Sequence, residues 1–206
     1  MRITKRSHII NYLIKLYKYK RYLEIGVRTP SCNFDKIKCK FKVGVDINPA
    51  SRCRYTMTSD MFFQKISPDK MYDIIFIDAL HLKDSVLKDV TNSLKHLSSG
   101  GVIVMHDCNP TSNVLQRVPK SDRKRKWNGD VWKAFAILRM TREDLNMYVV
   151  NINQGCGIVR KGKQKLFEKV KEDCLTYSFL VKKRKKLLNL VSTAQFRKKE
   201  KKRRGV

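Results

Sequence analysis

The sequence predicts an α/β fold in which a mostly parallel sheet is covered by helices on both faces. The first observation is that short, almost wholly apolar runs recur along the chain, as strands buried on both faces require. The second is that amphipathic helical patterns fill the gaps between these runs. The third is that the last two runs flank a tight NQG turn, which is typical of an antiparallel hairpin.

The predicted elements alternate along the chain. A helix over residues 7–19, with Ser7 as its N-cap, precedes the first strand and packs on the edge of the sheet. Helices are also predicted over residues 85–97, which end at an SSGG break, and over residues 131–140, where Asp130 is placed to cap the first turn. The strands are predicted over residues 22–27, 41–46, 55–58, 73–78, 102–107, 147–152 and 156–160.

Composition divides the chain near residue 162. Residues 1–162 hold all the predicted strands and are long enough for one domain with a full core. Residues 163–206 form a basic extension, in which residues 165–191 have the pattern of one or two amphipathic helices. Residues 197–206, RKKEKKRRGV, are predicted to be disordered because they offer almost nothing to bury.

The net charge of +28 is the most unusual property of the composition. A basic surface attracts polyanions such as nucleic acid or an anionic membrane, and the C-terminal extension is its densest part. A lysine-rich, solvated surface without such a partner is the alternative, and the sequence leaves both open.

Cysteine usage and hydropathy bear on location. The six cysteines form no CxxC pair and no spacing typical of a disulfide framework or zinc site, so we expect reduced thiols in a cytoplasmic protein. No apolar run approaches the ~20 residues that a transmembrane helix needs. The first ten residues lack the apolar stretch of a signal peptide.

Polar residues recur where the predicted strands end. Ligands of such sheets bind beyond the carboxyl ends of the strands, so this edge is the candidate site. The residues there are Glu24, Gly26, Asp46, Ser59, Asp60, Asp78, His81, His106 and Asp107.

The first part of this edge predicts a nucleoside cofactor. Asp46, about 20 residues after Gly26, could accept both ribose hydroxyls of an adenosine; a strand-end aspartate that starts a turn is the alternative. The loop GVRTPSCNF lacks the glycines that a pyrophosphate needs, which disfavours NAD. S-adenosylmethionine has no phosphate and suits this loop, with Glu24 meeting its amino-acid end. Ser59 and Asp60 could hydrogen-bond the adenine, or could be the N-cap of a helix that starts at MFFQK.

The second part predicts a metal site. Asp78 and Asp107 end strands that we expect to be neighbours, about 4.8 Å apart. Two carboxylates at that range repel unless a cation or proton lies between them, and Mg²⁺ with oxygen ligands and waters suits the position. His106 adds a possible ligand, and His81 could accept the proton of a metal-held hydroxyl. Turn-capping aspartates and a surface histidine are the alternative.

A polar, basic loop over residues 109–126 precedes the predicted substrate residues. A loop of this length in a compact domain is often a lid or a binding loop. Trp127 could stack on a sugar or another flat substrate, whereas Trp132 is expected in the core. Asp130 could contact substrate, cap its helix, or do both.

Taken in order, several motifs resemble class I S-adenosylmethionine-dependent methyltransferases. These motifs are YLEIGV, KVGVDINP, YDIIFIDALH, LKHLSSGGVIVMHDCNP, NGDVWKAF and GCGIVRKG, and they span about residues 20–162. Within the class they look most like the metal-dependent O-methyltransferases related to macrolide-sugar and cephalosporin-pathway enzymes. The resemblance implies a Rossmann-like, seven-stranded sheet with the order 3-2-1-4-5-7-6.

The resemblance also implies roles for individual residues. Asp78 would bind the metal, His81 would be the general base, and Asp46 would bind the ribose. Asp107 fits the second metal ligand, but His106 stands where the family usually has a glutamate. The first loop keeps one glycine and lacks the others.

Two functions of different classes follow. The first is an O-methyltransferase that uses S-adenosylmethionine and a divalent cation, with Mg²⁺ favoured, on a small-molecule or glycan hydroxyl. The second is a nucleic-acid-binding or RNA-modifying protein of the same fold; the IDALH sequence offers no NPPY-like or DPPY-like motif for methylating a base amino group. Contact of the basic extension with an anionic membrane is a minor option. The oligomeric state is left open.

Overall fold

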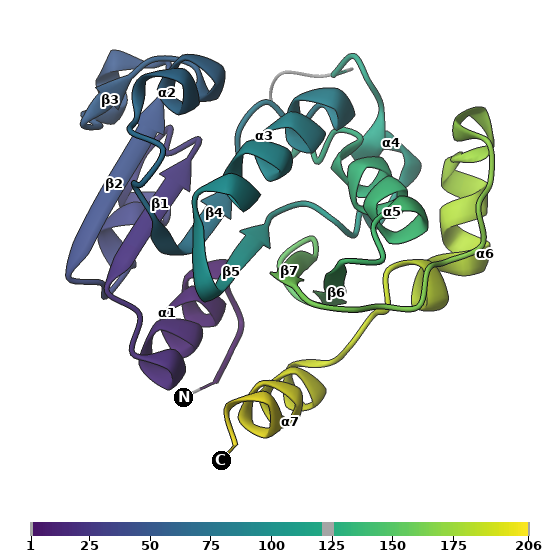
Figure 1. The fold of residues 1–206 in the computed structure, drawn as a ribbon. Helices are drawn as coiled ribbons and strands as arrows, with labels where there is room; N and C mark the ends of the chain where they lie inside the picture. Colours follow the sequence, from purple (N-terminus) through teal and green to yellow (C-terminus); the bar gives the residue numbers. More distant parts are fainter. Residues whose placement is uncertain (1, 121–125, 206) are drawn as a thin grey trace.

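The computed structural model describes residues 2–120 and 126–205, and these form a seven-stranded sheet flanked by helices (Figure 1). The strand order β3-β2-β1-β4-β5-β7-β6 is the order that the resemblance implied. The strands are β1 Arg21–Ile25, β2 Phe41–Asp46, β3 Tyr55–Thr56, β4 Tyr72–Ile77, β5 Leu97–Met105, β6 Leu145–Val150 and β7 Cys156–Lys161. The helices are α1 Arg6–Tyr17, α2 Ser59–Lys65, α3 Lys83–Lys95, α4 Asn113–Gln116, α5 Val131–Thr141, α6 Tyr177–Leu187 and α7 Thr193–Arg204. Short 3₁₀ turns complete the set: η1 Pro30–Cys32, η2 Phe34–Lys36, η3 Pro49–Ser51 and η4 Glu172–Cys174.

The register brings the ends of the central strands to one edge. β1, β2, β4 and β5 are parallel, and Ile25 pairs with both Val45 and Ile77, which in turn pairs with Met105. The residues that follow these positions therefore share the carboxyl edge of the sheet. β7 runs antiparallel to both β5 and β6, which confirms the predicted hairpin.

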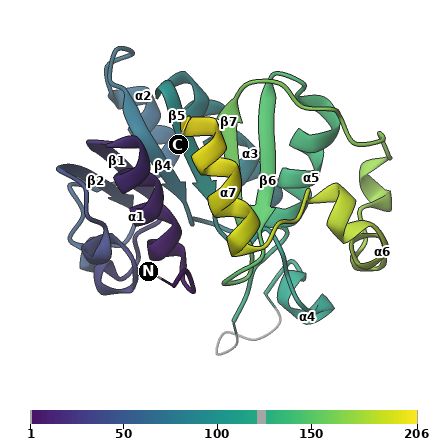
Figure 2. The same cartoon turned by 90° about the horizontal axis from the view of Figure 1, so that it is seen from below.

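Each face of the sheet is covered by its own helices. α2, α3, α5 and α6 contribute to one core, whose largest side chain, Trp132, is fully buried as predicted. α1 and α7 lie side by side across the other face (Figure 2). The core there includes Ile9, Leu13, Tyr148 and Phe196. The continuous apolar strands are thus explained by burial on both sides.

The prediction of disorder at the C-terminus is wrong for the residues that α7 covers. Ser192 starts α7 with a capping box, in which its side chain and that of Gln195 bond to each other's backbone. Phe196 and Glu200, four residues apart on one helical face, are both fully buried. A charge-rich sequence can therefore fold here, because one apolar and one acidic side chain reach the sheet.

Two smaller expectations are also corrected. α1 begins at Arg6 with Lys5 as its N-cap, so Ser7 lies inside the helix and does not cap it. The SSGG segment, expected as a helix break, lies in β5, which starts at Leu97. A register shift between β4 and β5 accommodates the two glycines. Among the described residues, no helix is long and apolar enough to cross a membrane.

Candidate active site

Four side chains from the ends of β4 and β5 meet at the carboxyl edge of the sheet. His81 Nε2 lies 3.2 Å from Asp78 Oδ1, and His81 Nδ1 lies 3.1 Å from Asp107 Oδ2. His106 Nδ1 lies 3.2 Å from Asp78 Oδ1 and 3.1 Å from Asp107 Oδ1. The prediction that Asp78 and Asp107 follow neighbouring strands is confirmed, and each imidazole bridges the two carboxylates.

The backbone at this cluster is held in an uncommon conformation. His81 has φ 56° and Asp107 has φ 59°, in the left-handed region that non-glycine residues seldom occupy. Such strain persists only where surrounding contacts fix it, and it gathers at functional sites. Asn128 supplies one such contact, because its amide donates to Asp107 Oδ1 over 2.7 Å. Another is the backbone N–H of Asp130, which donates to the carbonyl of His81.

The donor set fits a divalent cation. One ligand atom each from Asp78, His81 and Asp107 can be chosen so that all lie within 4.8 Å of one another. His106 Nδ1 is buried and, among the described residues, has no hydrogen-bond partner of good geometry, although both carboxylates are near. Carboxylate oxygens and imidazole nitrogens are ligands that Mn²⁺, Mg²⁺ and similar ions accept. The geometry selects His81 as the third ligand beside Asp78 and Asp107. The sequence predicted His106 in that role.

Without a cation, the two imidazoles and the two carboxylates shift one another's pKa values. Burial alone would raise the pKa of Asp78, but the nearby imidazoles of His106 and His81 lower it far below its usual range. Burial alone would lower the pKa of His106, but Asp78 and Asp107 outweigh it and raise that pKa to about 10. The pKa of His81 is also raised by the same carboxylates against the effect of burial. The site is therefore built to hold positive charge between two acids.

The predicted cofactor residues on β1 and β2 lie along the same edge. Asp46 Oδ2 accepts from the backbone N–H of Arg28 over 2.6 Å, and its Oδ1 accepts from that of Asn48 over 2.8 Å. These bonds order the loops after β1 and β2 around the carboxylate. A carboxylate has about four lone-pair positions, so acceptor capacity for ribose hydroxyls is left.

Glu24 is buried within this edge. Its Oε2 accepts from the hydroxyl of Tyr22 over 2.5 Å and from the amide of Asn33 over 3.0 Å. Burial raises its pKa to about 7, although both hydrogen bonds act in the opposite direction. Glu24 can therefore exchange a proton near neutral pH, and a cationic ammonium group would favour its ionised form.

Gly26 is required by the close approach of two loops. It has φ 86°, and a Cβ placed there would lie 2.3 Å from the carbonyl oxygen of Asp78. The glycine thus lets the turn after β1 pass against the turn after β4. The sequence predicted Gly26 among the cofactor-binding residues of this edge, and that role stays a prediction.

Ser59 and Asp60 occupy the first turn of α2, and their described partners are on α3. Asp60 pairs with Lys88, and the hydroxyl of Ser59 hydrogen-bonds to Asp89. The residue that caps α2 is Thr58, whose hydroxyl accepts from Met61 N. The alternative that these two residues cap the helix is therefore wrong, because they lie inside its first turn, and their contact with adenine stays a prediction.

The predicted substrate residue Trp127 stacks on His81, with ring centroids 5.5 Å apart and planes at 17°. The carbonyl of Trp127 lies 3.0 Å from His81 Nδ1, so Trp127 covers His81, the predicted general base. Asp130 does not cap α5 with its side chain; its Oδ1 accepts from Lys83 N at the start of α3. Residues 121–125 of the preceding loop lie outside the described residues.

Sequence reasoning missed three contacts of the cluster. Arg6, at the start of α1, places a guanidinium nitrogen 3.7 Å from Asp78 Oδ2. Asn153, from the hairpin turn, has its Oδ1 3.3 Å from His106 Nε2. Asn128 follows Trp127 in an NGD sequence, which is typical of a turn, whereas no local pattern marks Arg6 or Asn153. All three reach the site only through tertiary packing.

The comparisons with known proteins agree with this architecture. A family profile described as a methyltransferase domain matches residues 47–108. A candidate caffeoyl-CoA O-methyltransferase from Staphylococcus aureus has a TM-score of 0.54 and 21% identity over 78% of this chain and 86% of its own. The O-methyltransferase TomG from Streptomyces achromogenes, solved with S-adenosylmethionine, has a TM-score of 0.54 and 16% identity over 76% and 79%. The Podospora anserina methyltransferase PaMTH1, solved with S-adenosylhomocysteine, has a TM-score of 0.53 and 18% identity over 78% and 80%.

No curated protein matches the sequence. At these identities the solved neighbours show the fold, and the methyltransferase profile matches one part of it, residues 47–108. The resemblance predicted from the sequence, to class I S-adenosylmethionine-dependent methyltransferases, is confirmed.

Proposed function

We propose that this chain, with its methyltransferase domain in the class I fold, is an O-methyltransferase that uses S-adenosylmethionine and a divalent cation. The observation that carries the proposal is the cluster of Asp78, His81, His106 and Asp107 at the carboxyl edge. We further propose that the acceptor is a hydroxyl of a sugar or glycan, a choice that rests on the resemblance and on the half-buried ring of Trp127, which stacks on His81. Six free thiols are consistent with the cytoplasmic location that we propose.

The residues of the site suit the binding of both the methyl donor and the cation. Asp46 and Glu24 would meet the ribose and the amino-acid end of the methyl donor. Asp78 and Asp107, with an imidazole, would hold the cation. When bound, the donor supplies an electrophilic methyl group and the cation supplies positive charge that lowers the pKa of a hydroxyl.

His81 is the residue that we expect to accept the proton of the acceptor hydroxyl. Its ring is fixed by Asp78 on one side and by Asp107 and the carbonyl of Trp127 on the other. A base whose orientation is fixed on both sides loses little entropy on reaching the transition state. The carboxylates raise the pKa of His81, and a bound cation, which would offset their negative charge, would favour its neutral, accepting form.

Calorimetric titration tests the proposal directly. S-adenosylmethionine and S-adenosylhomocysteine are titrated into the protein with and without Mg²⁺ or Mn²⁺, and transfer of a labelled methyl group to sugar acceptors is then measured. We expect binding of both compounds, and transfer that excess EDTA abolishes. Absence of any S-adenosylhomocysteine binding, or undiminished transfer in EDTA, would refute the corresponding part.

Two variants separate the roles of the histidines. His106→Ala is expected to weaken Mn²⁺ binding at least tenfold. Loss of one protein group around a metal commonly lowers the metal affinity by this factor. His81→Ala is expected to abolish transfer while Mn²⁺ still binds. If His81→Ala loses the metal and His106→Ala keeps it, the ligand set is the one that geometry selects, and His81 is not the base.

A further inference from the structure

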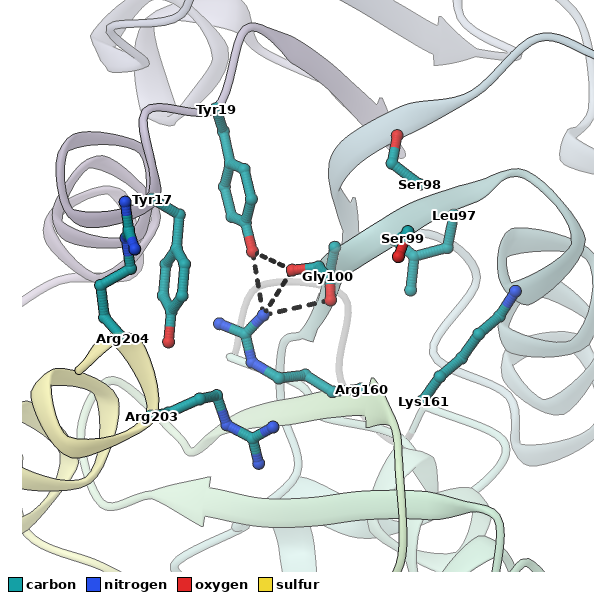
Figure 3. A pocket seen from close by; sticks show the side chains of 11 residues that line it. Tyr17, Tyr19, Leu97, Ser98, Ser99, Gly100, Arg160, Lys161, Arg203 and Arg204 are labelled. Carbon is teal, nitrogen blue, oxygen red and sulfur yellow. Dashed lines mark hydrogen bonds between the residues drawn. The ribbon is translucent and has the colours of Figure 1, made fainter.

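A pocket of about 410 Å³ lies at the edge of the sheet opposite the candidate active site. It is formed where β5 begins, where β7 ends and where α1 and α7 terminate (Figure 3). Its walls include the side chains of Tyr17, Tyr19, Ser99, Arg160, Lys161, Arg203 and Arg204. None of the residues predicted to bind cofactor, metal or substrate belongs to it.

The lining of this pocket is strongly cationic. Arg160, Lys161, Arg203 and Arg204 contribute four positive charges, and no aspartate or glutamate is among the lining residues. Two acids border the pocket. Glu200 is fully buried and is occupied by Arg160 and two tyrosine hydroxyls. Asp73 accepts from the hydroxyl of Ser98, a lining residue, and pairs with Arg21. One of the four lining cations is thus neutralised, and three exposed cations remain around the cavity. A concave surface with charge of a single sign concentrates anions.

Arg160 is a rigidly held part of the pocket wall. The residue is 3% exposed, and one guanidinium nitrogen donates to the hydroxyl of Tyr19 and to the carbonyls of Gly100 and Gly101. Its guanidinium also lies 4.7 Å from the ring centre of Tyr17. Among the described residues, Arg160 Nε is a buried donor with no hydrogen-bond partner. An anion oxygen that reached this N–H would supply the acceptor that it lacks.

The remaining cations are exposed and supply free donors. Lys161, Arg203 and Arg204 are all exposed, and Figure 3 shows the guanidinium of Arg203 near Arg160, whereas the side chain of Lys161 lies on the other side and points away from Arg160. Arg203 makes one bond, to Asn146, so most of its five N–H groups stay available. The planar, forked guanidinium geometry matches the oxygens of a phosphoryl group.

The surroundings favour a nucleic-acid strand over a lipid surface as the source of that group. The exposed face of α7 continues from the pocket with Lys198, Lys199, Lys201 and Lys202. Consecutive phosphates of a strand could follow such a row. Membrane-binding helices need exposed apolar anchors, and none of the exposed large apolar side chains of the described residues lies on α7 or in the pocket.

We propose that this pocket and the exposed face of α7 form a site for the phosphate backbone of a nucleic-acid strand. The site lies away from the carboxyl edge and does not depend on which acceptor is methylated, or on whether methyl transfer occurs. Its chemistry is backbone binding without base recognition, because the charged lining groups are cations, the backbone carbonyls are already bonded, and the rings of Tyr17 and Tyr19 stack on each other.

Fluorescence anisotropy with the full-length protein tests the proposal. The probe is a labelled single-stranded RNA of about 12 nucleotides, within the usual site size of such proteins. We compare the double variant Arg203→Gln/Arg204→Gln with Lys182→Gln/Lys185→Gln, which removes the same charge from the exposed side of α6. The pocket variant is expected to weaken binding about tenfold and to reduce the salt slope of log Kd by about 1–2. The α6 variant is expected to change the affinity about twofold.

A third variant tests the cavity itself. Ser99→Glu places an acid on the exposed rim of the pocket without touching α7, and we expect it to weaken RNA binding as strongly as the arginine variant. Equal losses in the α6 and α7 variants would overturn the proposal, because binding would then follow net charge alone. So would full RNA affinity in Ser99→Glu. Binding to phosphatidylserine vesicles without any RNA binding would assign the surface to a membrane and would also overturn it.

Discussion

Glu24 is a buried carboxyl group, and burial makes its ionised form unfavourable. Its pKa, ordinarily 4.5, is raised to about 7 in the folded chain because burial outweighs the bonds from Tyr22 and Asn33. A raised folded-state pKa means that the group's stabilising contribution is complete below about pH 4.5. That contribution is lost as the pH rises through about 7.

Replacing Glu24 by glutamine should therefore remove a pH dependence. We expect the wild type to lose up to about 3 kcal/mol of unfolding free energy, relative to Glu24→Gln, between pH 4.5 and pH 8. Urea unfolding of both proteins at several pH values measures the difference. Two stability curves that run parallel through this range would show that Glu24 ionises freely in the folded chain.

Gly129 has a different kind of constraint, because its neighbour leaves no room for a side chain. It has φ 58°, and a Cβ there would lie 1.8 Å from the carbonyl oxygen of His81. Gly129→Ala is expected to lower the unfolding free energy by more than about 2 kcal/mol and to displace Trp127 from His81. Urea unfolding and the fluorescence of the tryptophans report the two effects.

Gly100→Ala is the matched control for backbone strain. Gly100 has φ 72°, but no atom lies within 4 Å of the position of its Cβ. Only the cost of a left-handed alanine, about 1 kcal/mol, is expected. Similar losses in the two variants would mean that strain alone, and not contact with His81, makes Gly129 necessary.

At the scale of elements, α7 shows what a single buried acid can organise. Glu200 accepts from Arg160, Tyr17 and Tyr148, and so joins α7 to α1, β6 and β7. Its loss would leave the guanidinium of Arg160 buried without a counter-charge. Breaking a buried pair in this way costs about 3–5 kcal/mol.

Glu200→Ala is therefore expected to be strongly destabilising in urea unfolding. Glu168→Ala, which breaks the exposed pair with Lys183, is the control and should cost no more than about 1 kcal/mol. A small effect at Glu200 would show that α7 contributes little to the stability of the sheet.

The strands were the elements that the sequence specified best. Continuous apolar runs and strand-end carboxylates predicted β1, β2, β4 and β5 to within a few residues, except at the start of β5. That start was missed because Ser98, Ser99 and the two glycines resemble a helix terminus locally. α7 was missed because its helical face carries only Phe196 and Glu200, and burial of the acid depends on Arg160, forty residues earlier.

At the scale of the whole molecule, one part of the candidate site could be predicted from the sequence and another part could not. The topology of a parallel sheet brings strand ends together, so Asp46, Asp78 and Asp107 could be placed on one edge from the sequence. The partners that orient them come from elsewhere in the chain. Arg6 and Asn153 reach the cluster from the first helix and the last turn, and no spacing rule connects those segments before the chain is folded.

The charge of the whole chain governs how its stability responds to salt. With 46 basic and 18 acidic residues, repulsion among like charges opposes the compact state more than exposed ion pairs support it. Salt screens exposed charges within about 10 Å at 0.1 M, so this repulsion should weaken as NaCl is added. We expect the Tm to rise between 20 and about 300 mM NaCl.

The Arg203→Gln/Arg204→Gln variant, with a lower charge, should start from a higher Tm and gain less from NaCl. Its two arginines add to the repulsion at low salt, and they make one described bond to the rest of the chain, from Arg203 to Asn146. Differential scanning calorimetry on both proteins measures the shift. A Tm that falls with NaCl would mean that surface ion pairs, such as Lys88 with Asp60, outweigh the excess of cations.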